Sequence, residues 1–212
     1  MLKLSTAAQE IINKNPLLKW GLSYRLLNLT KLASFIKPQI EARTKKEVKA
    51  SAILMTLSRM QNISSKLSPK PENFPIENIT FRTNLTTMTF LKTKPTQEKI
   101  NLAHKQIQEE GSFISISEGT NEITLATEEK HIPTIEKFVS KTPVNRQDSL
   151  TAIHIKFMQE YNDQPGFLFL VIQQLTLQHI NIVEITSTFS ELIVYIDSKE
   201  SRLAFDTLVT SF

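Results

Sequence analysis

The chain has 212 residues, enough for one large domain or for two to three small ones. Of these residues 40% are hydrophobic and 22% charged, a balance typical of a folded protein. It contains no cysteine, which excludes disulfides and thiolate chemistry. The first residues lack the apolar run of a signal peptide, and the densest apolar stretch, residues 166–172, is too short to span a bilayer. We therefore expect a cytoplasmic protein without a membrane segment.

The charge is divided unevenly along the chain. Residues 1–70 carry thirteen Lys and Arg against three acidic residues, whereas the remainder carries twelve basic and eighteen acidic residues. The first segment therefore has a net charge of +10 and the remainder −6, which sum to the overall +4. A segment this basic is a candidate surface for a polyanion, although a solvated, lysine-rich helical face would give the same count.

Residues 5–60 show apolar residues at helical spacing and no strand-like alternation, which predicts an all-helical domain over residues 1–61. The stretch from Asn28 to Ala33 resembles the opening of a helix-turn-helix, with Thr30 as the expected N-cap of a helix that Pro38 breaks or kinks. A helix over residues 45–60 would then be the recognition helix. The expected DNA contacts are Lys31, Lys45, Lys46, Lys49 and Arg59. A role in dimerisation or in bracing a partner protein fits the same residues.

Serines and prolines dominate residues 62–75, which predicts a linker. Beyond it the pattern predicts the element order β-α-β-β-α twice, over a first module at residues 76–142 and a second at residues 150–212. Short apolar runs at residues 79–81 and 88–91 are expected to be separate strands. The first run has no place within the first module, so we expect it to complete the sheet of the second.

Two segments of the second module carry a resemblance to a known family. Residues 162–168 (Asn-Asp-Gln-Pro-Gly-Phe-Leu) and 178–182 (Gln-His-Ile-Asn-Ile) resemble the ACT domain, and residues 186–194 are similar to the regulatory region of aspartate kinases. The resemblance is weaker in the first module, where Lys94-Pro95-Thr96 replaces the glycine turn. It implies an α+β fold of two tandem ferredoxin-like (βαββαβ) modules, interleaved with each other, that bind an amino-acid effector and pair into a homo-dimer.

A glycine between the first strand and the helix allows a tight turn that leaves amides exposed at the helix N-terminus, and these amides with the helix dipole favour a carboxylate. The expected ligand-binding residues surround this turn and the following strand: Asn162, Asp163, Gln164, Pro165, Gly166, Phe167, Asn181 and Ile182. The alternative is that the turn is only a tight connection without a ligand.

The sequence contains no pattern that predicts catalysis. Four glycines do not form a nucleotide-binding loop, and the four histidines have no metal-ligand spacing, so we expect no enzyme activity, no cofactor and no metal. An aspartate kinase needs a large nucleotide- and aspartate-binding domain, and no segment of these 212 residues corresponds to one. The preferred interpretation is an amino-acid-responsive regulator of transcription, and the alternative is a non-catalytic regulatory subunit whose helical domain docks on a metabolic enzyme.

Overall fold

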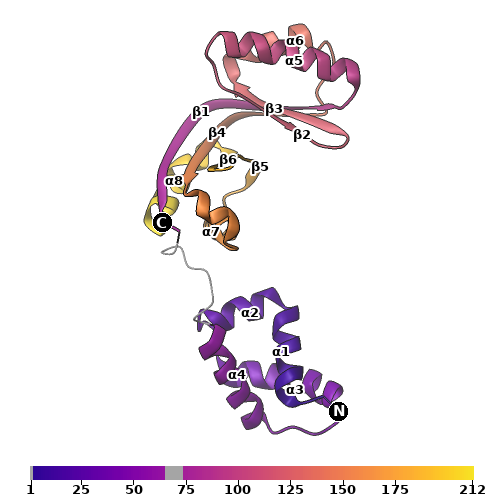
Figure 1. Cartoon of the computed structure of the whole chain (residues 1–212), viewed down its shortest axis with the longest axis vertical. Coiled ribbons are helices and arrows are strands. Elements are labelled where there is room, and N and C mark those ends of the chain that lie inside the picture. Colours follow the sequence, from indigo (N-terminus) through magenta and orange to yellow (C-terminus); the bar gives the residue numbers. More distant parts are fainter. Residues whose placement is uncertain (1, 65–73) are drawn as a thin grey trace. The chain divides into compact units, whose positions relative to one another are not determined.

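The computed structural model describes residues 2–64 and 74–212, which fall into two compact units divided between Pro69 and Lys70 (Figure 1). Of the predicted linker, residues 65–73 lie outside the described residues. Residues 62–64 form the last turn of a helix, and Phe74 is buried in the core of the second unit.

The described residues of the first unit form four helices: α1 (Leu4–Lys14), α2 (Pro16–Ser23), α3 (Leu29–Thr44) and α4 (Ala50–Ser64). Their apolar faces meet in one core that includes Ile12, Leu22, Ile36 and Leu57. The cap of α3 is Asn28, whose Oδ1 accepts the amide of Lys31 at 3.0 Å, so the expectation that Thr30 caps this helix is wrong.

Two further expectations for the first unit concern Pro38 and the start of the next helix. Helix α3 is not broken at Pro38, because the fully buried Ile36 and Ile40 hold the helix in the core on both sides of the proline. The helix expected from residue 45 begins only at Ala50. Lys45 ends α3 in the left-handed conformation with a φ of 55°, and residues 46–49 connect the two helices.

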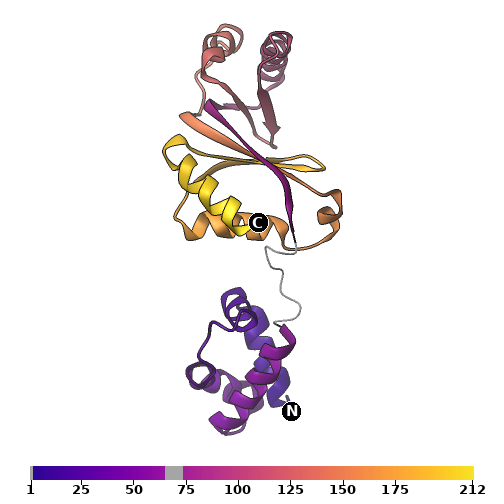
Figure 2. The ribbon, with the colours of Figure 1, turned by 90° about the vertical axis from the view of Figure 1, so that its left-hand side faces the viewer.

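The second unit is one antiparallel sheet with helices, in the strand order β2-β3-β1-β4-β6-β5. Its elements are β1 (Ile76–Leu91), α5 (Lys94–Glu109), β2 (Ile114–Glu118), β3 (Glu122–Glu128), η2 (Glu129–His131), α6 (Ile132–Phe138), β4 (Asn145–Phe157), η3 (Gln159–Asp163), α7 (Phe167–Leu177), β5 (Ile182–Ser187), β6 (Glu191–Asp197), η4 (Ser198–Glu200) and α8 (Ser201–Ser211). Figure 2 shows α5 and α6 at one end of this unit and α7 and α8 at the other, with the sheet between them.

The long strands β1 and β4 belong to both modules. In the first half of β1, Ile79 pairs with Ile155 of β4 and packs into the core beneath α7 and α8. In its second half, Met88 and Phe90 pack with residues of α5 and α6. The predicted interleaving is therefore confirmed. The expectation of two separate strands at residues 79–81 and 88–91 is wrong, because they are one strand whose pairing with β4 shifts register twice between the two runs.

Candidate ligand-binding site

The turn that precedes α7 leaves the start of this helix open. The chain leaves β4, forms the short helix η3 and reaches Gly166, whose φ of 126° is disfavoured for any residue with a Cβ. Within the described residues, no side chain caps the N-terminus of α7. The first amides of this helix therefore need partners from outside it, and the helix dipole favours a negative group beside them.

A cavity of about 320 Å³ lies at this end of α7. One wall is the turn itself, from Asn162 and Gln164 to Phe167, and the other is formed by residues of β5, β6 and the loop between them. None of the lining residues is charged: Phe157, Tyr161, Asn162, Gln164, Pro165, Gly166, Phe167, Leu168, Ile185, Ser187, Thr188 and Leu192. The walls thus combine an apolar surface with amide and hydroxyl groups, the usual composition of a small-molecule site.

Two side chains hold the walls of the cavity in place. The amide nitrogen of Asn162 donates to the carbonyl of Gln159 at 2.9 Å and to that of Phe189 at 2.6 Å, which ties the turn to the β5–β6 loop. The hydroxyl of Tyr161 donates to the carbonyl of Pro75 at 3.1 Å. Burial, with the nearby carboxylates of Glu160 and Glu77, raises the pKa of Tyr161, so the phenol stays protonated as this donor.

The corresponding corner of the first module is closed by its own side chains. The hydroxyl of Thr93 accepts the amide of Thr96 at 3.3 Å and so caps α5, and it also lies 2.8 Å from the hydroxyl of Thr96. Pro95, next in the turn, has no amide hydrogen to offer. The ammonium group of Lys141 lies 3.3 Å from the Thr96 hydroxyl. Several polar groups of this corner, those of Thr93, Thr96 and Lys141, are therefore already paired within the chain.

No protein family model and no curated protein matches the chain. Several solved structures are similar to residues of the second unit. The ligand-free regulatory subunit of aspartate kinase from Thermus thermophilus aligns with 65% of this chain and 97% of its own, at 11% identity and a TM-score of 0.51. The second unit has the fold of aspartate kinase regulatory subunits.

Whole kinases show the same likeness over part of their length. The aspartate kinase of Clostridium acetobutylicum aligns with 65% of this chain at 15% identity and a TM-score of 0.55, and E. coli aspartokinase III, bound to aspartate and ADP, with 66% at 12% identity and a TM-score of 0.51. The matching segment spans only 35% and 34% of those two chains. The predicted ACT-like architecture is confirmed as a fold.

Within this ACT-like unit, the predicted ligand residues separate into two groups. Asn162, Gln164, Pro165, Gly166 and Phe167 line the cavity. Asp163 is exposed and lies outside the lining. Asn181 and Ile182 follow the C-terminal end of α7, about 16 Å along the helix from its start at 1.5 Å per residue, and do not line the cavity.

Sequence reasoning missed the second wall of the cavity. Its polar residues are Ser187 and Thr188, and its apolar residues are Ile185 and Leu192. Three of the four, Ser187, Thr188 and Leu192, lie in the stretch that carries the resemblance to aspartate kinases, and Ile185 directly precedes it, but the resemblance assigned no role to these side chains. Only the pairing of β5 with β6, and of β6 with β4, brings these residues beside the turn.

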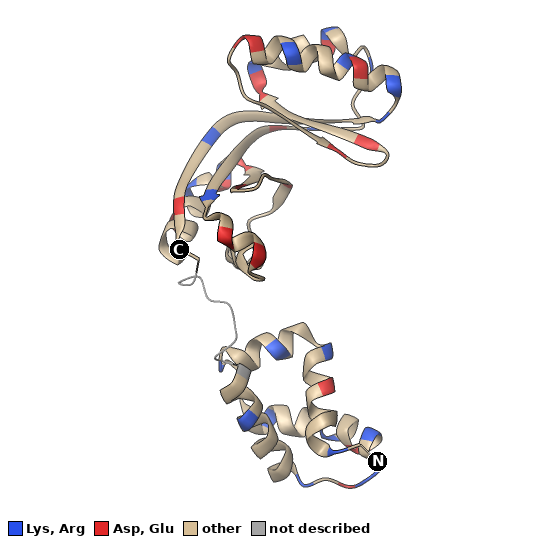
Figure 3. Ribbon diagram, viewed as in Figure 1, with Lys and Arg blue, Asp and Glu red and all other residues tan. Residues whose placement is uncertain are grey.

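The basic residues of the first unit do not gather in one place. Lys and Arg are spread over all four helices (Figure 3). Lys31 lies in the first turn of α3 and Lys45 just beyond its end, about 20 Å apart along the helix. Lys46 and Lys49 lie in the α3–α4 connection, and Arg59 lies in α4. Three of the predicted DNA contacts thus lie between the end of α3 and the start of α4: Lys45, Lys46 and Lys49. Lys31 lies apart from them, at the start of α3.

Among the described residues, no cluster of three or more His, Cys, Asp or Glu side chains could hold a metal ion. No helix in the described ranges combines the length and apolar character needed to cross a bilayer.

Proposed function

We propose that the chain is a non-catalytic regulatory protein that binds a free amino acid in the cavity at the start of α7 and acts on a metabolic enzyme. The observation that carries the proposal is the uncapped N-terminus of α7 beside a cavity with uncharged walls. The likeness to regulatory subunits of aspartate kinase supports a regulatory role, because it extends over 97% of one such subunit. The helical unit would supply the surface that docks on the enzyme.

The lining of the cavity defines the class of amino acid. The ligand carboxylate would lie at the amides of α7, where hydrogen bonds and the helix dipole both favour it. The side-chain oxygens of Gln164, Ser187 and Thr188 can accept hydrogen bonds from the ammonium group. No charged residue lines the cavity, and burying an unpaired charge is costly, so the ligand side chain would be uncharged and in part apolar.

The site would exist once per chain, in the second module only. In the first module Thr93 already caps α5 and Pro95 lacks an amide hydrogen, so a carboxylate would have fewer free donors there. A homo-dimer through the modules is part of the proposal. The outer strands β2 and β5 are the two edges of the sheet, and an edge strand can pair with a second copy.

A thermal-shift screen of the whole chain against the twenty amino acids tests the proposal. A ligand at 100 times its dissociation constant should stabilise the second unit by about 2.7 kcal/mol. We expect a hit among the uncharged amino acids and none with lysine, arginine, aspartate or glutamate. Gln164→Ala and Gly166→Ala should reduce the shift, the first by removing a hydrogen-bonding group and the second by straining the turn.

Lys94→Ala is the matched control, because Lys94 is an exposed residue at the corresponding turn of the first module. It should leave the shift unchanged. If no amino acid stabilises the protein, the cavity is not an amino-acid site. If Lys94→Ala abolishes the shift while Gln164→Ala does not, the ligand binds in the first module instead.

A regulator of transcription is the second candidate, favoured by the net charge of +10 over residues 1–70. DNA bound through several phosphates should be released steeply as salt is raised. Docking on a protein through apolar helical faces should weaken far less. A salt titration of duplex DNA binding therefore separates the two roles of the helical unit, and failure to bind DNA at low salt excludes the second candidate.

A further inference from the structure

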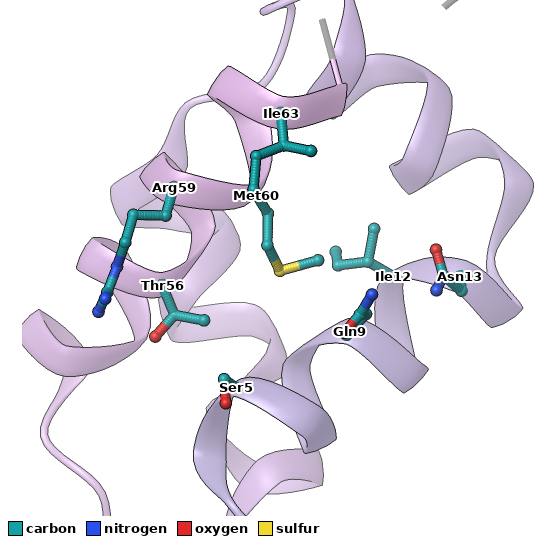
Figure 4. Close-up of a pocket in the computed structure, with 8 residues that line it drawn as sticks. All are labelled: Ser5, Gln9, Ile12, Asn13, Thr56, Arg59, Met60 and Ile63. Atoms are coloured by element: carbon teal, nitrogen blue, oxygen red, sulfur yellow. The ribbon is translucent and has the colours of Figure 1, made fainter. Parts of the chain in front are cut away.

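The first unit contains a second cavity, which the amino-acid site does not use. It lies between α1 and α4 and has a volume of about 360 Å³. Figure 4 shows residues of α1 on one side and residues of α4 on the other. The eight lining residues are Ser5, Gln9, Ile12, Asn13, Thr56, Arg59, Met60 and Ile63. This volume is within the usual range for sites that hold small molecules.

The cavity has an apolar base and a polar side on α1. Met60 of α4 points toward Ile12 of α1, which is 1% exposed, and together they form an apolar base (Figure 4). On α1, Ser5, Gln9 and Asn13 follow one another at intervals of four residues, so they line one side of the helix with hydroxyl and amide groups. A ligand held here would place an apolar body on the base and polar atoms toward the rim.

Arg59 is the single charged residue in the lining of this cavity. It lies along the α4 rim beside Thr56 (Figure 4), and in the described part of the chain it makes no ion pair, unlike Lys37, which lies 3.6 Å from Glu41. Thr56 donates its hydroxyl hydrogen to the carbonyl of Ala52 at 2.9 Å, so this hydrogen is not available to a ligand. Arg59 is exposed and extends from the rim away from Met60 and Ile12 (Figure 4). A ligand on the apolar base whose single carboxylate reaches this rim can be bound by the guanidinium through two parallel hydrogen bonds.

We propose that the cavity between α1 and α4 binds a small monocarboxylic acid with a short apolar body and no amino group. The carboxylate pairs with Arg59 and accepts hydrogen bonds from Ser5, Gln9 or Asn13, while the apolar body packs on Ile12 and Met60. A free amino acid fits less well because the single charge in the lining is the positive Arg59, which repels its ammonium group. This inference is independent of the amino-acid site on α7.

Three probes of equal carbon skeleton test it on the whole chain: 4-methylpentanoate, leucine and 4-methylpentan-1-ol. Binding is followed by the amide shifts of α1 and α4 in a nuclear magnetic resonance titration. We expect 4-methylpentanoate to shift these amides and to bind at least about tenfold more tightly than either other probe. The alcohol lacks the carboxylate that pairs with Arg59, and leucine adds an ammonium group that Arg59 repels. Arg59→Gln should weaken 4-methylpentanoate by about tenfold or more.

Arg43→Gln is the matched control, since Arg43 is an exposed arginine of the same unit outside the cavity. It should leave the affinity unchanged, and Arg59→Lys should give an intermediate affinity by retaining the charge. Three results would overturn the proposal: no shift of the α1 and α4 amides with 4-methylpentanoate, equal affinity for the alcohol, or equal losses in the two glutamine variants. Leucine bound at the α7 site would shift amides of the second unit, so the two sites are read separately.

Discussion

Two residues at corresponding positions end the first helix of each module. Gly111 lies two residues beyond the last residue of α5 and has a φ of 67°, and the amide of Ser112 donates to the carbonyl of Ile107 at 3.3 Å. His179 lies two residues beyond the last residue of α7 and has a φ of 60°, and the amide of Ile180 donates to the carbonyl of Leu175 at 3.1 Å. Both are left-handed C-terminal caps, but only the first has the residue that adopts this conformation at no steric cost.

His179→Gly should therefore stabilise the second unit. The left-handed conformation costs a residue with a Cβ about 1–2 kcal/mol, and the greater freedom of glycine in the unfolded chain returns part of this gain. We expect a net increase of about 0.5–1 kcal/mol in the free energy of unfolding, measured by urea denaturation. A decrease would mean that the histidine side chain makes a stabilising contact that outweighs its backbone strain.

The opposite substitution, of glycine by a residue with a Cβ, can be made at Gly111 in the first module. Gly111→Ala should destabilise it by about 1 kcal/mol, because a Cβ there is disfavoured by the backbone conformation. A Cβ at this position meets no atom within 4 Å, so crowding does not contribute to the loss. Urea denaturation of both variants measures the cost of the left-handed conformation, as a loss of stability in Gly111→Ala and as a gain in His179→Gly. An unchanged stability of Gly111→Ala would show that the left-handed caps carry little strain here.

At the scale of the elements, the shared strands β1 and β4 change register where they pass from one module to the other. Asn84 and Ser149 both have a positive φ there, 58° and 56°. Asp148 joins the strands, since it accepts the hydroxyl of Thr86 at 2.8 Å and the guanidinium Nε of Arg146 at 2.9 Å. Desolvation acts to raise the pKa of Asp148, but the hydrogen bonds from Arg146 and Thr86 outweigh it and hold the pKa below its ordinary value.

A carboxyl whose pKa is lower in the folded protein stabilises the fold above its unfolded pKa and loses that contribution as pH falls through the folded value. The Asp148 side chain is 49% exposed, so solvent screens part of this contribution. Asp148→Asn should therefore lower the free energy of unfolding by about 0.5–1 kcal/mol at pH 7, and by less below about pH 4. Urea denaturation at both pH values measures this. Asp206→Asn, on the exposed face of α8, is the control and should change stability by less than about 0.5 kcal/mol at either pH. A constant effect of Asp148→Asn across pH would exclude the charge as its cause.

The elements also show which features the sequence allowed us to predict. Alternation and helical spacing predicted most helices and strands of the second unit, and the missing strand of the second copy predicted that residues 79–81 complete its sheet. The continuity of β1 was missed because the polar residues from Arg82 to Asn84 interrupt the apolar pattern at the register shift. The lining of the cavity was also predicted only in part. The turn wall is local in sequence, whereas Ser187 and Thr188 reach it only through strand pairing.

At the scale of the whole molecule, the described residues form separate hydrophobic clusters within the two units. One cluster belongs to the helical unit and includes Ile36, which is 0% exposed. The clusters that include Ile155, Met88 and Tyr195 belong to the second unit. Since each described cluster draws its residues from one unit, loss of packing in the helical unit should not propagate through a shared core.

Ile36→Ala should destabilise the helical unit by about 2–5 kcal/mol, the usual loss when a buried isoleucine is truncated to alanine. The neighbouring Phe35 is 64% exposed, so Phe35→Ala should change stability by less than about 0.5 kcal/mol although it removes a larger side chain. Hydrogen exchange resolved by residue measures both units in one protein. We expect Ile36→Ala to speed exchange in α1, α3 and α4 and to leave the amides of β1 and β4 protected. Faster exchange across the sheet in this variant would show that the two units unfold together.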